Sequence, residues 1–250
     1  MIKSILITGG GSGIGAALAK TLADRGCDVI VSGRRQSVLD AVASQSPNIS
    51  AHPADVTNSD DQTALADALS NLAAPRALFH GAGYFQLGQL EKLSQADWQR
   101  SFETNVTARW ALSNKCAACL DGGRMLFIGS DSGNNVRIGA AAYSIAQAAS
   151  ETLRRAIQAE WTNRDIAVGA FKPGLVDTDM VRGFLAKSEA EFPARKAFQA
   201  YIDRGEYATP QTVAAFAASL LLDVESECFK NTEWDFRHTD HHLQWSGSKP

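Results

Sequence analysis

The sequence predicts an α/β protein in which a doubly wound parallel sheet of about seven strands is covered by helices on both faces. Three observations support this fold class. Short apolar segments rich in β-branched residues alternate with longer segments of helical periodicity, which is typical of repeated βαβ units. A glycine-rich segment, residues 8–15, separates the first apolar segment from the first helical one. The 250 residues, 45% of them hydrophobic, suffice for one large core.

The expected strands are short and continuously apolar. A parallel sheet is buried on both faces, so its strands show no alternation of polar and apolar residues. Right-handed crossovers through the intervening helices then give the doubly wound arrangement. The segments with this composition are Ser4–Ile7, Asp28–Ser32, Ile49–His52, Ala77–Phe79, Met125–Ile128 and Ile166–Phe171.

We expect residues 1–250 to form a single domain. The alternation of strands and helices breaks down over about residues 175–207, where Gly183, Pro193 and Gly205 stand among mixed charges. This segment is predicted to be a lid over the site. Residues 234–250 are predicted to be a C-terminal tail that packs over the lid or over a neighbouring subunit.

Composition argues against several classes of protein. The formal net charge of -3 offers no basic stripe for nucleic acid and no polybasic membrane anchor. No apolar segment reaches the ~20 residues that a membrane span needs, and Met1 leads directly into the first strand segment. Four cysteines are too few for a disulfide scaffold, and Cys116 and Cys119 lie in an Ala-rich helical segment where packing is the favoured role. We predict a cytoplasmic protein with a small-molecule partner.

Residues 8–15 read TGGGSGIG and lie between the first expected strand and the first expected helix. Glycines let backbone N–H groups approach a pyrophosphate, and the N-terminus of a helix adds partial positive charge. Tight turns also need glycine, so the position after a strand and before a helix is what favours nucleotide binding. The expected contacts are Gly9, Ser12, Gly13, Ile14 and Gly15.

The spacing Thr-Gly-x-x-x-Gly-x-Gly resembles the cofactor turn of the short-chain dehydrogenase/reductase family, which implies a Rossmann-type domain. The resemblance extends from Ile5 to about Thr178. One landmark departs from the family pattern, because His80-Gly81 stands where the family has two asparagines. The other landmarks follow in order as Asp55-Val56, Asn105, Ser130 with Tyr143, and Pro173–Thr178. Beyond the glycine turn, the resemblance implies cofactor contacts from Asp55, Val56, Gly81, Ala82, Gly83, Tyr143, Gln147, Pro173, Gly174, Val176 and Thr178.

The end of the second strand predicts which cofactor is preferred. An acidic residue there would bind the ribose hydroxyls of NAD and repel a 2′-phosphate, and none is present. Arg34 instead offers a planar, permanently charged group suited to phosphate, and Arg35 follows it. The resemblance therefore implies NADP(H) rather than NAD(H). The alternative is a solvated arginine pair at the start of a helix.

The resemblance also implies catalytic roles. Tyr143 would exchange a proton with the substrate oxygen while a hydride moves between the nicotinamide and a carbonyl carbon. Ser130 would donate a hydrogen bond to the same oxygen, and Asn105 would hold a helix kink and an ordered water. Taken separately, a serine after a strand can be a helix cap and a tyrosine in a helix can be packing. The aromatic residues of the lid fit a medium-sized, partly apolar ketone or aldehyde.

Gln147 stands where the family has its active-site lysine. Residues four apart lie on one helix face, so Tyr143 and Gln147 can share a cofactor. Glutamine can still hydrogen-bond a ribose, but it cannot lower the phenol pKa from its ordinary value of about 10. We therefore expect carbonyl reduction, which needs a protonated tyrosine, to be damaged less than alcohol oxidation. Lys172 either brings a replacement charge or reaches into solvent.

Two alternative interpretations and the mode of assembly remain to be considered. The missing lysine and the altered His80-Gly81 favour a catalytically impaired dinucleotide-binding protein that serves as a sensor or in assembly. His238, His241 and His242 have the ligand type of a metal site but lack a scaffold, so no metal is predicted. The resemblance implies a homodimer or homotetramer formed by the helices of Asn105 and Tyr143, with the apolar residues Trp110, Leu112, Leu153 and Ile157.

Overall fold

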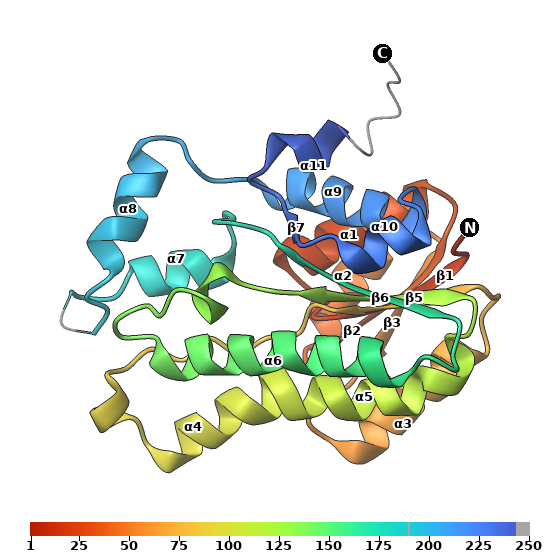
Figure 1. The fold of residues 1–250 in the computed structure, drawn as a ribbon, viewed down its shortest axis with the longest axis horizontal. Coiled ribbons are helices and arrows are strands. Elements are labelled where there is room, and N and C mark those ends of the chain that lie inside the picture. Colours follow the sequence, from red (N-terminus) through yellow and green to blue (C-terminus); the bar gives the residue numbers. More distant parts are fainter. Residues whose placement is uncertain (190, 244–250) are drawn as a thin grey trace.

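The computed structural model describes residues 1–189 and 191–243 and has the predicted α/β architecture (Figure 1). Within these residues, the strands form one parallel sheet of seven strands in the order β3-β2-β1-β4-β5-β6-β7. The chain builds outward from β1 to β3 and then crosses back to the other side of β1. The strands are β1 Ser4–Thr8, β2 Asp28–Gly33, β3 Ile49–Pro53, β4 Arg76–His80, β5 Gly123–Ile128, β6 Ile166–Lys172 and β7 Trp234–Asp235.

The centre of the sheet is buried on both faces. All five residues of β1 are buried, and Ile5 pairs in register with Val29 of β2 and Ala77 of β4. This burial explains why the strands are continuously apolar. The order of strand addition reverses between β1 and β4. Open α/β sheets bind ligands at the carboxyl ends of the strands beside such a switch point.

Helices cover one face around α1, which packs against α9 (Figure 1). Leu18 and Leu22 of α1, together with Phe216 of α9, are fully buried in the larger core. Apolar side chains on these helices therefore close the sheet from above. The helices on this face are α1 Gly13–Asp24, α2 Gln36–Ala43, α9 Pro210–Leu222, α10 Ser226–Asn231 and α11 Thr239–Leu243.

The opposite face carries α3 Ser59–Ser70, α4 Gln95–Phe102, α5 Ala108–Cys116 and α6 Ala141–Glu160. A π-helical turn, Glu103–Thr107, joins α4 to α5. Cys116 is buried in the second core and Cys119 packs against it, as the packing interpretation expected. The Sγ of Cys119 donates a hydrogen bond to the carbonyl oxygen of Cys116 at 3.2 Å.

The predicted lid segment contains α7 Asp179–Leu185 and α8 Arg195–Asp203, which project beyond the sheet (Figure 1). Residue 190 of this segment lies outside the described residues. A bridge between Val176 and Ala208 joins the two ends of the segment. Phe184 and Phe192 are buried in a third, small core that includes the partly buried Phe85. The segment is thus a folded unit with its own aromatic core.

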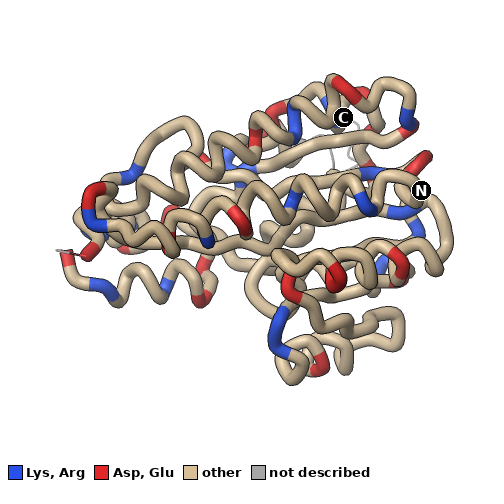
Figure 2. Tube along the Cα trace, turned by 90° about the horizontal axis from the view of Figure 1, so that it is seen from below, with Lys and Arg blue, Asp and Glu red and all other residues tan. Residues whose placement is uncertain are grey.

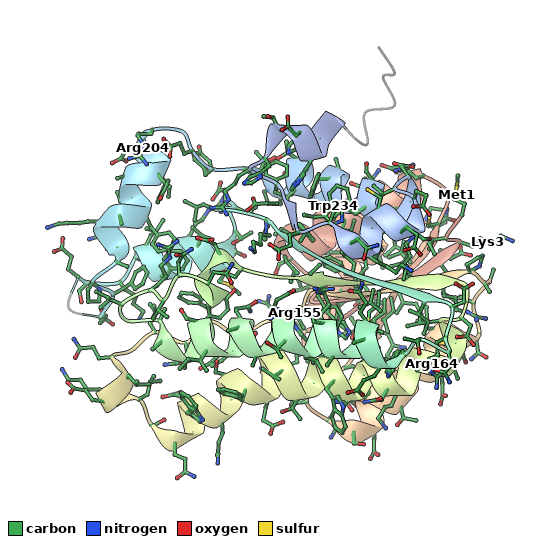
Figure 3. The ribbon with its side chains drawn as sticks, viewed as in Figure 1. Met1, Lys3, Arg155, Arg164, Arg204 and Trp234 are labelled. Carbon is green, nitrogen blue, oxygen red and sulfur yellow. The ribbon has the colours of Figure 1, made fainter. Side chains whose placement is uncertain are left out.

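The structure corrects the predicted tail. Trp234 and Asp235 form β7 in parallel with Phe171 and Lys172 of β6. Trp234 is only 1% exposed, and its indole Nε1 donates to the carbonyl oxygen of Phe229 in α10 at 3.1 Å (Figure 3). The chain from residue 234 therefore completes the sheet. Residues 244–250, including Trp245, lie outside the described part.

Two of the four apolar residues expected at an assembly face are core residues, while the assembly itself stays a prediction. Leu112 and Ile157 belong to the second core and Leu153 packs against it, whereas Trp110 is 54% exposed.

Acidic and basic residues are interspersed along the helices seen in Figure 2, with no stripe of one sign on that side. In residues 1–189 and 191–243, no helix combines the length and apolarity that crossing a bilayer requires.

Candidate active site

A cavity of about 920 Å³ opens at the carboxyl ends of the central strands, beneath the lid segment. Every predicted site residue except Asn105 lines it, from the glycine turn and Arg34 to Ser130, Tyr143 and Gln147. Residues from the carboxyl ends of six strands, β1 to β6, and from the lid segment thus meet in one space. The fold has brought together residues that are separated by up to about 230 positions in the sequence, from Gly9 to Arg237.

Glycine is required at the turn between β1 and α1. Gly9 and Gly13 have φ angles of 69° and 53°, which side chains disfavour. A Cβ on Gly15 would lie 2.3 Å from the carbonyl oxygen of Gly9. Ser12 is the N-cap of α1, yet its side chain makes no capping hydrogen bond. The Ser12 hydroxyl and the first N–H groups of α1 therefore stay available to a ligand in the cavity.

Thr8 holds the next cavity segment against this turn. Its Oγ1 accepts hydrogen bonds from the N–H groups of Gly81 and Ala82, both at 3.2 Å, and donates to the carbonyl oxygen of Phe79. A Cβ on Gly9 would lie 2.7 Å from the oxygen of Gly81. The backbone that follows β4 is therefore packed against the glycine turn, and side chains at either place would separate the two.

Arg34 and Arg35 line the far end of the cavity and form no ion pair with a carboxylate of the described residues. Beside them, Oδ1 of Asp55 accepts hydrogen bonds from the N–H and hydroxyl of Thr57 at 3.0 and 2.7 Å. Burial raises the pKa of Asp55, but the Thr57 bonds and the charge of Arg34 hold it below its ordinary value. This end of the cavity therefore combines an ionised carboxylate with two cations that a phosphate could engage.

Asn105 lies in the π-helical turn and is fully buried, but it does not line the cavity. Its Oδ1 accepts from the N–H of Tyr84 at 3.1 Å, and its Nδ2 donates to the carbonyl oxygens of Tyr84 and Ser101 at 2.8 and 2.9 Å. The helix irregularity expected at Asn105 is present. The side chain itself clamps the cavity loop at Tyr84, and a role toward an ordered water stays a prediction.

Ser130 follows β5, and Tyr143 and Gln147 lie one turn apart near the start of α6. Burial raises the pKa of Tyr143, while the charge of Arg109 and a hydrogen bond with Ser130 lower it, and the balance is a raised value. Gln147 is 5% exposed, and its Oε1 has no hydrogen-bond partner in the described part of the chain. The phenol of Tyr143 is therefore protonated at neutral pH. One helical turn away, the Oε1 of Gln147 is a buried acceptor that could bind a ligand donor.

Arg109 is the residue that sequence reasoning missed. Its side chain reaches the cavity from α5, is buried, and donates to the carbonyl oxygen of Ile128 at 3.0 Å and to the hydroxyl of Ser150 at 2.8 Å. Burial lowers its pKa to about 10. The available signal was its position four residues after Asn105, on the same helix face. Lys172, by contrast, does not line the cavity.

The lid end of the cavity is mainly apolar. Phe85 lies against Tyr143 with ring centroids 4.6 Å apart, and it also contacts Phe184 at 5.1 Å. Phe198 and Tyr201 line the cavity too, whereas Phe192 is fully buried and serves packing. A small aromatic chamber therefore adjoins the Tyr143 side of the cavity.

His80, His241 and His242 take structural positions. Nε2 of His80 lies 2.9 Å from the hydroxyl of Ser113, and its ring packs on Phe127. His241 hydrogen-bonds the backbone of Asp235, and His242 meets the carbonyl oxygen of Phe236 at 2.5 Å. Residues 1–189 and 191–243 hold no cluster of three potential metal ligands.

Comparison with known proteins agrees with the geometry of this site. The family model described as short chain dehydrogenase matches residues 3–189. The chain belongs to the short-chain dehydrogenase family. This match includes the glycine turn, Ser130 and Tyr143, and it ends within the lid segment. The protein is accordingly an oxidoreductase of the short-chain dehydrogenase type.

Individual relatives of this short-chain dehydrogenase have diverse activities. It is 28% identical over 235 residues to 2,3-dihydro-2,3-dihydroxybenzoate dehydrogenase of Escherichia coli K12, covering 90% of this chain and 91% of the relative. It is also 28% identical to the cyclic-di-GMP-binding biofilm dispersal mediator protein of the same organism, over 87% and 89% of the two chains. Actinorhodin polyketide ketoreductase, solved with NADPH, matches with a TM-score of 0.82 and 25% identity over 94% of this chain and 95% of its own.

Proposed function

We propose that this short-chain dehydrogenase uses NADP(H) to reduce a small or medium-sized carbonyl compound. One observation carries the proposal: a single cavity joins two unpaired arginines, Arg34 and Arg35, to the Ser130–Tyr143 pair. The first pair suits a phosphate and the second suits a carbonyl oxygen. Support for the cofactor class also comes from a relative of matching fold that was solved with NADPH.

The residues present fit a nicotinamide dinucleotide. A Cβ at Gly9 would collide with the backbone of Gly81, and a Cβ at Gly15 with that of Gly9, so glycine at both positions allows the compact turn whose backbone could approach a pyrophosphate. The unpartnered Oε1 of Gln147 is an acceptor that a ribose hydroxyl would satisfy. Arg34 and Arg35 would hold the 2′-phosphate, with Asp55 and Val56 beside the adenine. The loop at Pro173, Gly174, Val176 and Thr178 would hold the nicotinamide.

When bound, the reduced cofactor would supply the hydride that the carbonyl carbon accepts. Tyr143 gives its phenolic proton to the carbonyl oxygen, so the ketone or aldehyde becomes an alcohol and Tyr143 becomes a phenolate that solvent must reprotonate. Ser130 donates a hydrogen bond to the same oxygen and stabilises the charge that develops there. Because the pKa of Tyr143 is raised, the residue already holds the proton that reduction requires. This favours reduction over oxidation at neutral pH.

The chamber at the lid end supports an apolar substrate group. Phe85, Phe184 and Phe198 lie beyond Tyr143, so a partly apolar carbonyl compound would place its carbonyl at Tyr143 and its hydrocarbon part among these rings. Homodimer or homotetramer formation and a cytoplasmic location stay predictions. The exposed Trp110 on α5 supports assembly through that helix.

The test is a fluorescence titration of the purified protein with NADPH and, separately, with NADH. We expect tighter binding of NADPH, and in Arg34→Ala a loss of NADPH affinity of about tenfold or more, because a charge-assisted hydrogen bond contributes about 1.5–3 kcal/mol. NADH binding should change little in the same variant. Lys115→Ala, on the outer surface of α5, is the matched loss of a cation. Equal affinities for both cofactors would contradict the Arg34 assignment.

A carbonyl screen with NADPH follows if binding is found. NADPH binding without turnover of any ketone or aldehyde would favour the second candidate, a binding protein of impaired catalysis. The residue that favours this candidate is Gln147. If neither NADPH nor NADH bound, both the reductase and the dinucleotide-binding candidate would be contradicted.

A further inference from the structure

Arg109 is a buried cation without a carboxylate partner. Its side chain is 3% exposed, and no Asp or Glu of the described residues lies within ion-pair distance of its guanidinium. Buried charges are normally paired, because desolvating an ion costs several kcal/mol. Burial of Arg109 therefore carries a desolvation free-energy cost, and its hydrogen bonds to neutral groups do not neutralise the charge.

The guanidinium is held in place by neutral acceptors from three parts of the chain. Nη1 donates to Ile128 of β5 and Ser150 of α6, and Nη2 reaches the carbonyl oxygen of Ala82 at 3.4 Å. Its Nε is buried without any partner in the described chain. Both Arg109 and Gln147 line the cavity beside Tyr143. Arg109 and Gln147 thus each carry one buried polar atom without a partner in the described chain, a donor and an acceptor, in the cavity that Tyr143 also lines.

Two titratable groups, His80 and Tyr143, interact electrostatically with Arg109. His80 of β4 is neutral, because burial and then the charge of Arg109 lower its pKa well below the ordinary value. Tyr143 of α6 is the other, and the charge of Arg109 opposes the rise that burial causes in its pKa. In turn, the interaction with Tyr143 offsets part of the decrease that burial causes in the pKa of Arg109. The guanidinium and the phenol are therefore electrostatically coupled within one cavity wall.

We propose that Arg109 is a positioning residue that supplies to Tyr143 the positive charge which the family obtains from a lysine at position 147. In this arrangement the two tasks of the lysine are divided. Arg109, on α5, stabilises the phenolate left after Tyr143 has given up its proton. Gln147, on α6, retains the hydrogen bond to the ribose. The inference rests on the proposed reductase function only for its consequence in catalysis.

The test measures the titration of Tyr143 in the cofactor-free protein. Fluorinated tyrosine replaces tyrosine throughout, which lowers phenol pKa values into a range where the fold is stable, and the ¹⁹F signal that disappears in Tyr143→Phe identifies the residue. We expect the titration midpoint to rise by about 1 unit or more in Arg109→Met, because an opposite charge nearby shifts a pKa by 1–3 units. Arg109→Lys should stay within about 0.5 unit of the parent because it keeps the charge.

Arg76→Met is the matched control. Arg76 also donates to backbone carbonyl oxygens, those of Leu72 and Cys119, but it lies at the opposite end of β4 from the cavity. The double variant Arg109→Met/Gln147→Lys moves the cation to the family position and should return the midpoint toward the parent value. Should Arg109→Met not fold, Arg109→Gln carries the same test, since it keeps hydrogen-bonding capacity without charge.

An unchanged Tyr143 midpoint in folded Arg109→Met or Arg109→Gln would overturn the proposal and leave Arg109 as a structural clamp. A rise in Arg76→Met equal to that in Arg109→Met would overturn it as well. These results are independent of turnover. If Tyr143 responds to Arg109 but the protein binds no NADPH, the charge assignment holds and the proposed reductase function fails.

Discussion

At Gly15, the absence of a single side-chain carbon allows the close backbone packing of the glycine turn. This glycine begins the buried face of α1, where alanine would ordinarily be the better helix former by about 1 kcal/mol. Its missing Cβ leaves room for the carbonyl oxygen of Gly9. Gly15 lines the cavity, and the close approach of Gly9 requires glycine there although alanine would favour the helix.

We expect Gly15→Ala to lower the free energy of unfolding by about 1–3 kcal/mol, because the added carbon would lie 2.3 Å from the oxygen of Gly9 and the turn would have to move. NADPH binding should fall with it. Gly183→Ala is the control: nothing lies within 4 Å of its Cβ position in α7, so the change should stabilise by roughly 0.5–1 kcal/mol. Chemical denaturation measures both. Equal effects of the two substitutions would contradict the steric argument.

Residue identity predicted most of the site, and burial supplied the rest. The glycine turn, Arg34, Ser130 and Tyr143 were found from type and spacing, and all of them line one cavity. Arg109 was missed because helical spacing shows only which residues share a face. Whether a charged group on that face meets solvent or a tyrosine depends on the other helix, which the sequence does not place.

At the scale of elements, the N-termini of α1 and α3 differ in a way that separates stability from binding. Asn58 caps α3, its Oδ1 accepting from the N–H groups of Asp60 and Asp61 at 2.9 and 3.0 Å. Ser12 stands at the same position of α1 without a capping bond. The first helix therefore leaves its N-terminal donors free toward the cavity, whereas the third satisfies its own.

Asn58→Ala should cost about 1 kcal/mol of stability, the usual loss of an N-cap, and leave NADPH affinity unchanged. Ser12→Ala should change stability by less than about 0.5 kcal/mol while it weakens NADPH binding several-fold, because the hydroxyl is not used by the helix. Thermal unfolding and a fluorescence titration of both variants give the comparison. A Ser12→Ala protein with lost stability and intact binding would reverse this assignment.

At the scale of the whole molecule, the last described strand ties the C-terminal segment to the sheet. Trp234 packs against Phe216 of α9 with ring centroids 6.3 Å apart, and its indole is anchored to Phe229 of α10. Arg237, just beyond β7, lines the cavity and pairs with Asp235 at 2.6 Å. The segment thus links the larger core to the site wall.

Trp234→Ala should lower the free energy of unfolding by about 3–5 kcal/mol, because it removes a fully buried aromatic side chain. Trp110→Ala, at a residue 54% exposed, should change monomer stability by no more than about 0.5 kcal/mol. Urea denaturation followed by circular dichroism measures both. Similar losses in the two variants would mean that α5 has a buried partner in solution, such as a second copy of the chain.

The sequence by itself determined the fold class, six of the strands to within about two residues at each end, and the family landmarks, because apolar period and glycine spacing are local properties of the chain. Only the tertiary structure decided that Trp234 belongs to the sheet, that Leu112 and Ile157 are core, and that Arg109 lines the same cavity as Tyr143. The physical reason is the same in each case. Burial and electrostatic coupling depend on which surfaces meet, and these surfaces come from segments far apart in the chain.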